Sequence, residues 1–233
     1  VLGEAVRHLI LIILALYTLA PLLFLFVNAF KSNNEIIASP VALPEHWTLQ
    51  YIKTAMEAIN FGKALGLTFI ITFFSILLLV IVSSFAAWAM VRSKTILSNI
   101  VFLCFTAAML IPFQSLMYPL LSVFEKMGLK NVQGLILMYG GFGLSMSVFL
   151  YHGFIKSVPA SLEEAAVLDG ANLFQMFFKV VFPLLKGTTV TVIVLNGMWI
   201  WNDYLLPFLV IGNKTGSKTL TLELYFAKLT SGQ

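Results

Sequence analysis

The chain has 233 residues, of which 60% are hydrophobic and only 10% are charged, and its mean hydropathy is +0.96. Soluble domains carry about 25% charged residues, so this composition excludes an ordinary soluble fold and favours an integral membrane protein. The 14 basic and 10 acidic residues are scattered, which leaves nucleic-acid binding without support, and the single cysteine, Cys104, can form no internal disulfide or zinc framework.

Uncharged segments define the predicted spans. A transmembrane helix needs ~20 apolar residues, and four segments without Asp, Glu, Lys or Arg reach that length: 9–30, 64–91, 96–124 and 131–155. A fifth, 187–213, contains one acid, Asp203. None alternates as a transmembrane β-strand would, so the sequence predicts an all-α polytopic membrane protein. Because the spans are odd in number and the chain stops in a polar stretch, we expect a sixth span to be missing at the C-terminus.

The first predicted span, residues 9–30, could alternatively be a cleavable signal peptide. Its apolar run is too long for a signal peptide, however, and no A-x-A cleavage site follows it.

The segment after the first span contains Leu49, Ile52, Met56 and Ile59, which recur at helical spacing. They predict a short helix over residues 48–59 that lies at the membrane surface, with Trp47 at headgroup level.

The third span holds two prolines, Pro112 and Pro119, with Gln114 and Tyr118 between them. Prolines break or kink a helix and free carbonyl groups that need partners. The segment is therefore either a hinge that lines a pathway or a static kink packed in the bundle, and Gln114 and Tyr118 are candidate lining residues.

The longest polar insert, residues 156–186, predicts two short helices outside the bilayer. Pro159 suits a first helical turn, Ser161 and Glu164 have capping-box spacing, and Gly170 suits the left-handed residue after a helix end. A second helix follows over about 171–182, its apolar face formed by Leu173, Phe174, Phe177, Phe178 and Val181, and Pro183 is expected to end it. Such a helix–turn–helix suits a docking element, with Ala165 and Ala166 allowing close approach.

The fifth span carries Asn196, Trp199, Asn202 and Asp203. Polar groups are costly in hydrocarbon and should face the bundle or a wet cavity, so these four are candidate pathway-lining residues. The alternative is a helix-packing hydrogen bond for Asn196 and an interfacial aromatic belt for Trp199.

The insert resembles the EAA loop of ABC importer permeases. Glu164, Ala165, Ala166, Gly170 and Pro183 stand at that motif's spacing, although Val180 and Phe182 replace the more usual Ile and Leu. Other segments resemble the smaller, MalG-like permease of maltose-type carbohydrate importers, and Asp169 fits the same branch. These segments are 29–32, 111–119, 128–131 and 201–207.

The resemblance implies a type I ABC importer transmembrane domain that spans residues 1–233 and transports a sugar. It implies an ATPase-docking loop formed by Glu163, Glu164, Ala165, Ala166, Asp169, Gly170 and Pro183, although Glu163 alone is better explained as an acid that complements a helix N-terminus. It also implies four kinds of partner: a second permease, two ATPase subunits that bind ATP and Mg, an extracytoplasmic sugar-binding protein, and the sugar itself.

The resemblance also implies the orientation of the chain in the membrane, and the absence of catalytic motifs bears on whether the chain is an enzyme. The counts of basic residues on the two sides do not settle the orientation, whereas a cytoplasmic EAA loop places the N-terminus in the cytoplasm of a prokaryote, with the spans in its inner membrane. No P-loop or hydrolase motif occurs, so the chain is not expected to be an enzyme, and no metal site is expected. The alternatives are a permease for a non-sugar solute and a secondary transporter, which would need more buried acids.

Overall fold

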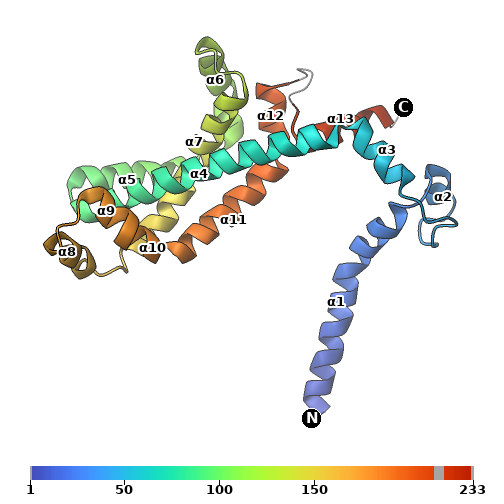
Figure 1. Ribbon diagram of the computed structural model, residues 1–233, viewed down its shortest axis with the longest axis horizontal. Coiled ribbons are helices and arrows are strands. Elements are labelled where there is room, and N and C mark those ends of the chain that lie inside the picture. Colours follow the sequence, from blue (N-terminus) through green and yellow to red (C-terminus); the bar gives the residue numbers. More distant parts are fainter. Residues whose placement is uncertain (1, 213–217, 232–233) are drawn as a thin grey trace. The chain divides into compact units, whose positions relative to one another are not determined.

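The computed structural model describes residues 2–212 and 218–231, and every regular element in these ranges is helical. The chain forms two compact units, residues 1–62 and 63–233, and each is considered by itself. Long helices dominate both units, in agreement with the predicted all-α class (Figure 1).

The first unit contains α1 (Leu2–Asn28), α2 (Asn33–Ala38) and α3 (Gln50–Ala58). Two side chains hold the loop after α1: Asn28 Nδ2 donates to the Pro40 carbonyl at 3.0 Å, and the buried Lys31 Nζ donates to the Ser39 carbonyl at 3.1 Å. Trp47 packs on Phe30, with ring centroids 5.1 Å apart. The predicted short helix is confirmed as α3.

The second unit is a helical bundle with a group of short helices at one end (Figure 1). Its long helices are α4 (Phe61–Ser93), α5 (Ile96–Ala108), α6 (Phe113–Lys126), α7 (Val132–Ile155) and α11 (Lys186–Asn202). The short helices between α7 and α11 are α8 (Ser161–Leu168), α9 (Leu173–Met176), a π-helix (Phe177–Val181) and α10 (Phe182–Leu184). The chain ends with α12 (Leu205–Val210) and α13 (Leu220–Ser231). Helix α7 is central, because α5, α11 and α12 all pack on it.

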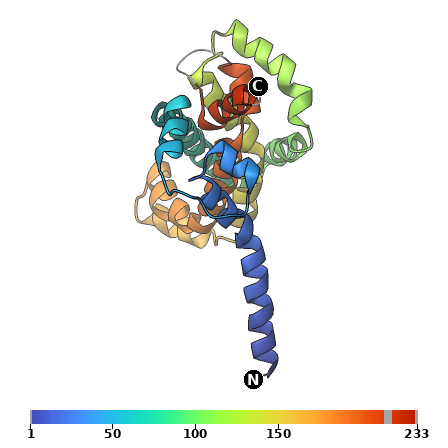
Figure 2. The same ribbon diagram turned by 90° about the vertical axis from the view of Figure 1, so that its right-hand side faces the viewer.

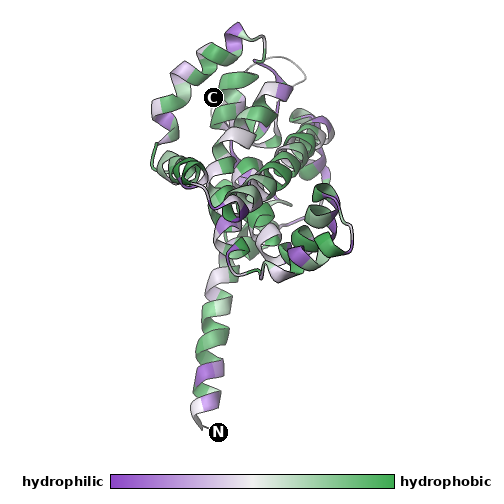
Figure 3. Cartoon of the chain, turned by 90° about the vertical axis from the view of Figure 1, so that its left-hand side faces the viewer, coloured by the Kyte–Doolittle hydropathy of each residue, from purple (hydrophilic) through white to green (hydrophobic). Residues whose placement is uncertain are grey.

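Within the described residues, three helices are long and apolar enough to cross a membrane, namely Gly3–Asn28, Phe61–Ser93 and Val132–Ile155. The number reaches five if each of two bent helix pairs forms one span. The long helices consist mainly of hydrophobic residues (Figure 3), and many of their large apolar side chains are exposed, such as Leu22, Phe69 and Phe149. This pattern is expected of helices whose solvent is lipid.

The third predicted span is a broken helix rather than a single kinked one. Helices α5 and α6 meet at 106° across residues 109–112, and α6 turns away from the line of α5 (Figure 2). Pro112 is the N-cap residue of α6, with an extended backbone, whereas Pro119 lies inside α6. The first proline therefore causes the break, because its ring disfavours a helical conformation at the residue before it.

The fifth predicted span, residues 187–213, is also interrupted in the structure. Helix α11 ends at Asn202, because Asp203 adopts an extended backbone, and α12 begins at Leu205. A continuous helix over 187–213 is therefore wrong, and its last residue, Asn213, lies outside the described residues. Helix α13 was not predicted, because its sequence is more polar than that of the spans.

Candidate docking site

The docking unit, as defined here, comprises α8, α9, the π-helix and α10, residues 161–184. Its first helix begins differently from the prediction. Ala160 is the N-cap residue of α8 and Ser161 is the first helical residue, so the predicted capping box of Ser161 and Glu164 is wrong. Glu163 and Glu164 still lie in the first turn, where negative charge complements the helix dipole.

The turn between the two arms follows the prediction for Gly170. Its φ is +80°, a left-handed conformation that glycine adopts without steric cost. The Gly170 amide donates to the Val167 carbonyl at 3.0 Å, and the Ala171 amide donates to the Ala166 carbonyl at 2.9 Å. This pair of bonds is the Schellman arrangement, so the turn is fixed by its own backbone.

The second arm is more irregular than predicted. Asn172 and Gln175 form a capping box at its start, which the sequence analysis missed. The π-helix then adds residues to one turn, so the buried side chains are Met176, Phe177 and Val181. The apolar face predicted from α-helical spacing is therefore only partly buried, with Leu173, Phe174 and Phe178 exposed. Pro183 lies inside α10 and does not end the arm, which bends by 76° into α11.

Glu163 is a contact between the docking unit and α4. Its carboxylate pairs with the Arg92 guanidinium, with Oε1 2.7 Å from Nη2 and 2.8 Å from Nε. The other carboxylate oxygen accepts a hydrogen bond from Trp88 Nε1 at 3.0 Å. The Glu163 side chain is 10% exposed and that of Arg92 is 22% exposed. The interpretation of Glu163 as an acid that merely complements the helix N-terminus is therefore incomplete.

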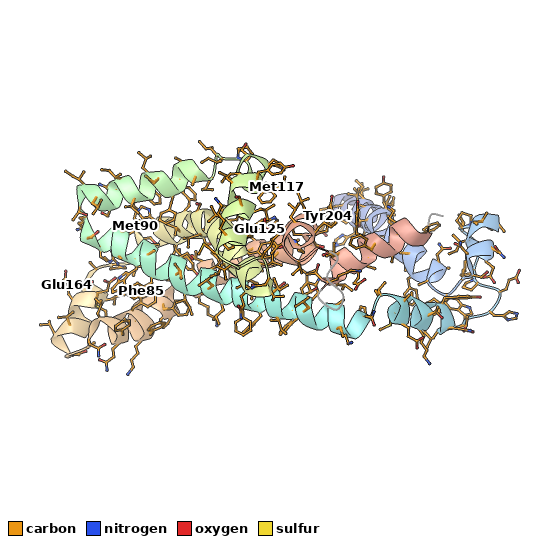
Figure 4. The ribbon with its side chains drawn as sticks, turned by 90° about the horizontal axis from the view of Figure 1, so that it is seen from above. Phe85, Met90, Met117, Glu125, Glu164 and Tyr204 are labelled. Atoms are coloured by element: carbon orange, nitrogen blue, oxygen red, sulfur yellow. The ribbon has the colours of Figure 1, made fainter. Side chains whose placement is uncertain are left out.

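Aromatic contacts join α4 to the second arm. Phe85 and Trp88 pack against Phe177, with ring centroids 4.9 and 5.2 Å apart, and Phe85 stacks on Phe174 at 6.2 Å. Figure 4 shows Phe85 where α4 meets the docking unit and Glu164 at the far end of that unit. One side of the docking unit thus packs on the bundle, and the other side is open.

The open side carries most of the predicted docking residues. Glu164, Ala165, Asp169 and Gly170 are exposed, whereas Ala166 is buried against the bundle. The expectation that both alanines offer a small outer face therefore holds for Ala165 alone. The prediction missed three exposed apolar side chains of α8, which are Leu162, Val167 and Leu168. Leu162 precedes Glu163, and Val167 and Leu168 follow Ala166, so helical spacing places all three off the inward face that Glu163 and Ala166 share.

The candidate pathway residues of the fifth span have different surroundings. Asn196 is buried, and its Nδ2 donates to Ser147 Oγ at 3.2 Å and to the Val192 carbonyl at 2.9 Å. Asn196 and Trp199 also line a cavity of about 650 Å³, most of whose other lining residues are apolar side chains of α5, α6 and α7. The helix-packing contact expected in the alternative is therefore present, and it lies at the edge of a cavity.

Asp203 and Asn202 do not line that cavity. Asp203 Oδ2 accepts from the Tyr139 hydroxyl at 2.9 Å, and Oδ1 accepts from the Leu205 amide at 2.9 Å. Asp203 thus stabilises the break between α11 and α12 and ties it to α7. Asn202 is exposed and donates to the Met198 carbonyl.

Gln114 and Tyr118 of α6 are exposed and lie outside the cavity lining, although α6 itself contributes Phe113 and Leu116 to it. The break between α5 and α6 borders the same cavity, through Met109 and Ile111. The pathway role of all six candidates stays a prediction.

Comparison with known proteins places the chain in a family. The binding-protein-dependent transport system inner membrane component family matches residues 80–231, which include the docking unit and α11. The chain belongs to this family. It is therefore a multi-pass permease component of a transport system.

Two relatives show how far the similarity of this permease extends. A probable starch degradation products transport system permease protein of Thermoanaerobacterium thermosulfurigenes is 46% identical over 92% of this chain and 78% of its own length. A melibiose/raffinose/stachyose import permease protein of Bacillus subtilis is 33% identical over 89% of this chain and 76% of its own length.

A solved structure confirms the fold of the permease. A chain of a bacterial ABC transporter involved in the import of the acidic polysaccharide alginate matches with a TM-score of 0.80. The match covers 97% of this chain and 79% of that chain, at 23% identity. The fold expected from the sequence, an ABC importer transmembrane domain, is thereby confirmed.

Cysteine accessibility tests the pathway prediction at the cavity. We expect a cysteine that replaces Trp199 to react with a small, water-soluble thiol reagent, at a rate that changes when ATP is added. Val194→Cys is the matched control, because Val194 lies on the opposite face of α11 and outside the cavity lining. The exposed native Cys104 must first be replaced by serine. Equal reactivity at positions 199 and 194 in every state would show that the cavity is not part of an aqueous pathway.

Proposed function

We propose that this chain is one permease subunit of an ATP-driven importer for a sugar or oligosaccharide. The observation that carries the proposal is the docking unit: a stiff helix–turn–helix, packed on the bundle by one side only, whose open side displays Glu164, Ala165, Asp169 and Gly170. A surface of this kind suits a partner that pushes on the membrane helices from outside the bilayer. The sugar is proposed from the relatives, whose names specify starch degradation products and melibiose, raffinose and stachyose.

The proposed assembly has four kinds of component besides the solute. This chain pairs with a second permease, and an extracytoplasmic binding protein delivers the sugar. Two ATPase subunits, which bind ATP and Mg, dock on the two permeases from the cytoplasm. Closure of the ATPases moves the docking unit, and the helices attached to it switch the pathway between inward-open and outward-open states. In this proposal the chain carries no catalytic residue of its own.

The proposed orientation places the N-terminus in the cytoplasm. Arg92 at the end of α4 contacts the docking unit directly, so the two lie on the same side of the membrane. If α1 and α4 are successive spans, a cytoplasmic docking unit then puts the N-terminus in the cytoplasm. An impermeant label added to intact cells should miss a cysteine at the exposed Ser161 and should reach it in inside-out vesicles. Labelling of Ser161→Cys in intact cells would reverse the orientation.

Purification of the assembled complex tests the function. The full-length protein, extracted in mild detergent, is expected to bring down a second permease and an ATPase, and vesicles that contain this complex should take up a maltodextrin only with ATP and the binding protein. Uptake of a compatible solute instead of any sugar would favour the non-sugar alternative, for which a 22% identical relative named as an osmoprotective compounds uptake permease protein gives some support. Uptake that needs no ATPase would contradict the proposal.

A further inference from the structure

A single stripe of α4 holds both arms of the docking unit. Phe85, Trp88 and Arg92 are spaced by three and four residues, so they lie on one face of α4. Phe85 and Trp88 contact Phe177 in the second arm, and Trp88 and Arg92 contact Glu163 in the first. Trp88 belongs to both sets of contacts.

Arg92 also holds the chain that enters the docking unit. Its Nη2 donates to the Val158 carbonyl at 3.0 Å, in the connection between α7 and α8. The guanidinium therefore contacts two sites five residues apart, Val158 and Glu163, and fixes the angle at which α8 leaves the connection. The carboxylate of Glu163 is held by donors on both of its oxygens, so its orientation is fixed as well.

A contribution to stability does not by itself explain why Arg92 and Glu163 are paired between α4 and α8. A buried ion pair adds little stability relative to apolar packing of the same volume, although loss of one partner is costly. The planar guanidinium of Arg92, with Nε and Nη2 both on Glu163 Oε1, does supply fixed geometry, which apolar side chains do not. The remaining surface of α8, by contrast, makes few contacts with the bundle, since only Glu163 and Ala166 of that helix are buried.

We infer that Arg92 and Glu163, together with Trp88, form a rigid link that makes the docking unit and the adjoining end of α4 move as one body. All three are positioning residues, which act through the geometry of α8 and touch neither the solute nor nucleotide. Through this link, a movement of α8 is passed on to α4. The chain connections pass the same movement on to α7 and α11. This inference rests on the proposed function, because it concerns the force that an ATPase applies to the docking unit.

The first test measures the rigidity directly. Spin labels are attached at the exposed Ser93 of α4 and Ser161 of α8 in a protein with Cys104→Ser. Their distance distribution is then measured by electron–electron resonance in the assembled complex, with and without ATP. We expect the same narrow distribution in both states while the labelled complex remains active in uptake. A distance that shifts between the states would show that α8 moves relative to α4 and would overturn the inference.

The second test removes one partner with the least change of shape. Glu163→Gln keeps the size of the side chain but removes the charge, so we expect the distance distribution to broaden. Uptake per ATP hydrolysed should fall by about tenfold or more. Membrane abundance and ATPase retention are measured alongside, and uptake is expressed per retained ATPase, because loss of one partner of this largely buried pair also destabilises the fold. The matched control is Glu57→Gln, which removes the same charge from the exposed Lys53–Glu57 pair and should change none of these quantities.

The outcomes separate this inference from the proposed function. Uptake per ATP that is unchanged in Glu163→Gln, or lost only in proportion to ATPase retention, would show that the pair serves folding or docking alone. If the unmodified chain retained no ATPase, the proposed function itself would fail, whereas the distance between residues 93 and 161 could still be measured.

Discussion

Gly170→Val is expected to leave the subunit in the membrane, to release the ATPase and to abolish uptake. Gly170 has a φ of +80°, and a left-handed conformation costs roughly 1–2 kcal/mol for a residue with a side chain and more for a β-branched one. No atom lies within 4 Å of the position of an added Cβ, so the cost comes from the backbone and not from a clash. The turn must open, which changes the angle between the two arms. The spans should still insert, because insertion depends on their apolar lengths.

The measurement combines membrane abundance, ATPase retention on pull-down, and solute uptake. Gly128→Val is the matched control, since Gly128 has a φ of +69° and open space around it, but lies in the connection between α6 and α7. It imposes a similar strain away from the docking unit and should leave ATPase retention unchanged. Gly170→Asn should be milder, because asparagine tolerates the left-handed region. Normal uptake and ATPase retention in Gly170→Val would show that the turn is an ordinary connection.

Gly143→Ala is expected to loosen the contact between α4, α7 and α11. An added Cβ would lie 2.6 Å from Asn196 Oδ1 and 2.7 Å from a methyl group of Leu79. Neither neighbour can move freely, because Leu79 is fully buried and Asn196 is hydrogen-bonded to Ser147 and to the Val192 carbonyl. Overpacking of this kind costs about 1–3 kcal/mol, so the purified variant should unfold or aggregate at a lower temperature.

Gly141→Ala separates this packing effect from the effect of alanine on the helix. Gly141 is in the same part of α7, and no atom lies within 4 Å of its added Cβ. In a helix, alanine is more favourable than glycine by roughly 0.5–1 kcal/mol. Gly141→Ala should therefore be neutral or slightly stabilising. Equal thermal stability of the two variants would show that the bundle adjusts around residue 143 without cost.

The length of each segment without charged residues predicts the long helices well, because the thickness of the bilayer sets the length of every span. Helices α1, α4 and α7 occupy the segments expected, and the conformation of Gly170 follows from local backbone sterics. These features depend on residues that are near one another in sequence, or on the membrane itself.

The features that the sequence did not predict depend on distant partners or on small energy differences. The pairing of Arg92 with Glu163 joins residues 71 positions apart, and nothing local to either one specifies it. The helix break at Asp203 is stabilised by Tyr139, 64 positions away. The π-helix at Phe177–Val181 cannot be recognised from hydrophobic spacing of 3.6 residues, because it adds a residue to the turn.

The exposed apolar side chains of α8 have a consequence for the life of the protein in the cell. Leu168 is 88% exposed and Val167 is 57% exposed, on a helix that we place outside the lipid. A copy that has not assembled with a partner would present these side chains to chaperones and proteases, which recognise exposed apolar surface. In the proposed assembly, a partner seated on α8 would cover these side chains, so copies that have not assembled would be degraded faster than assembled ones.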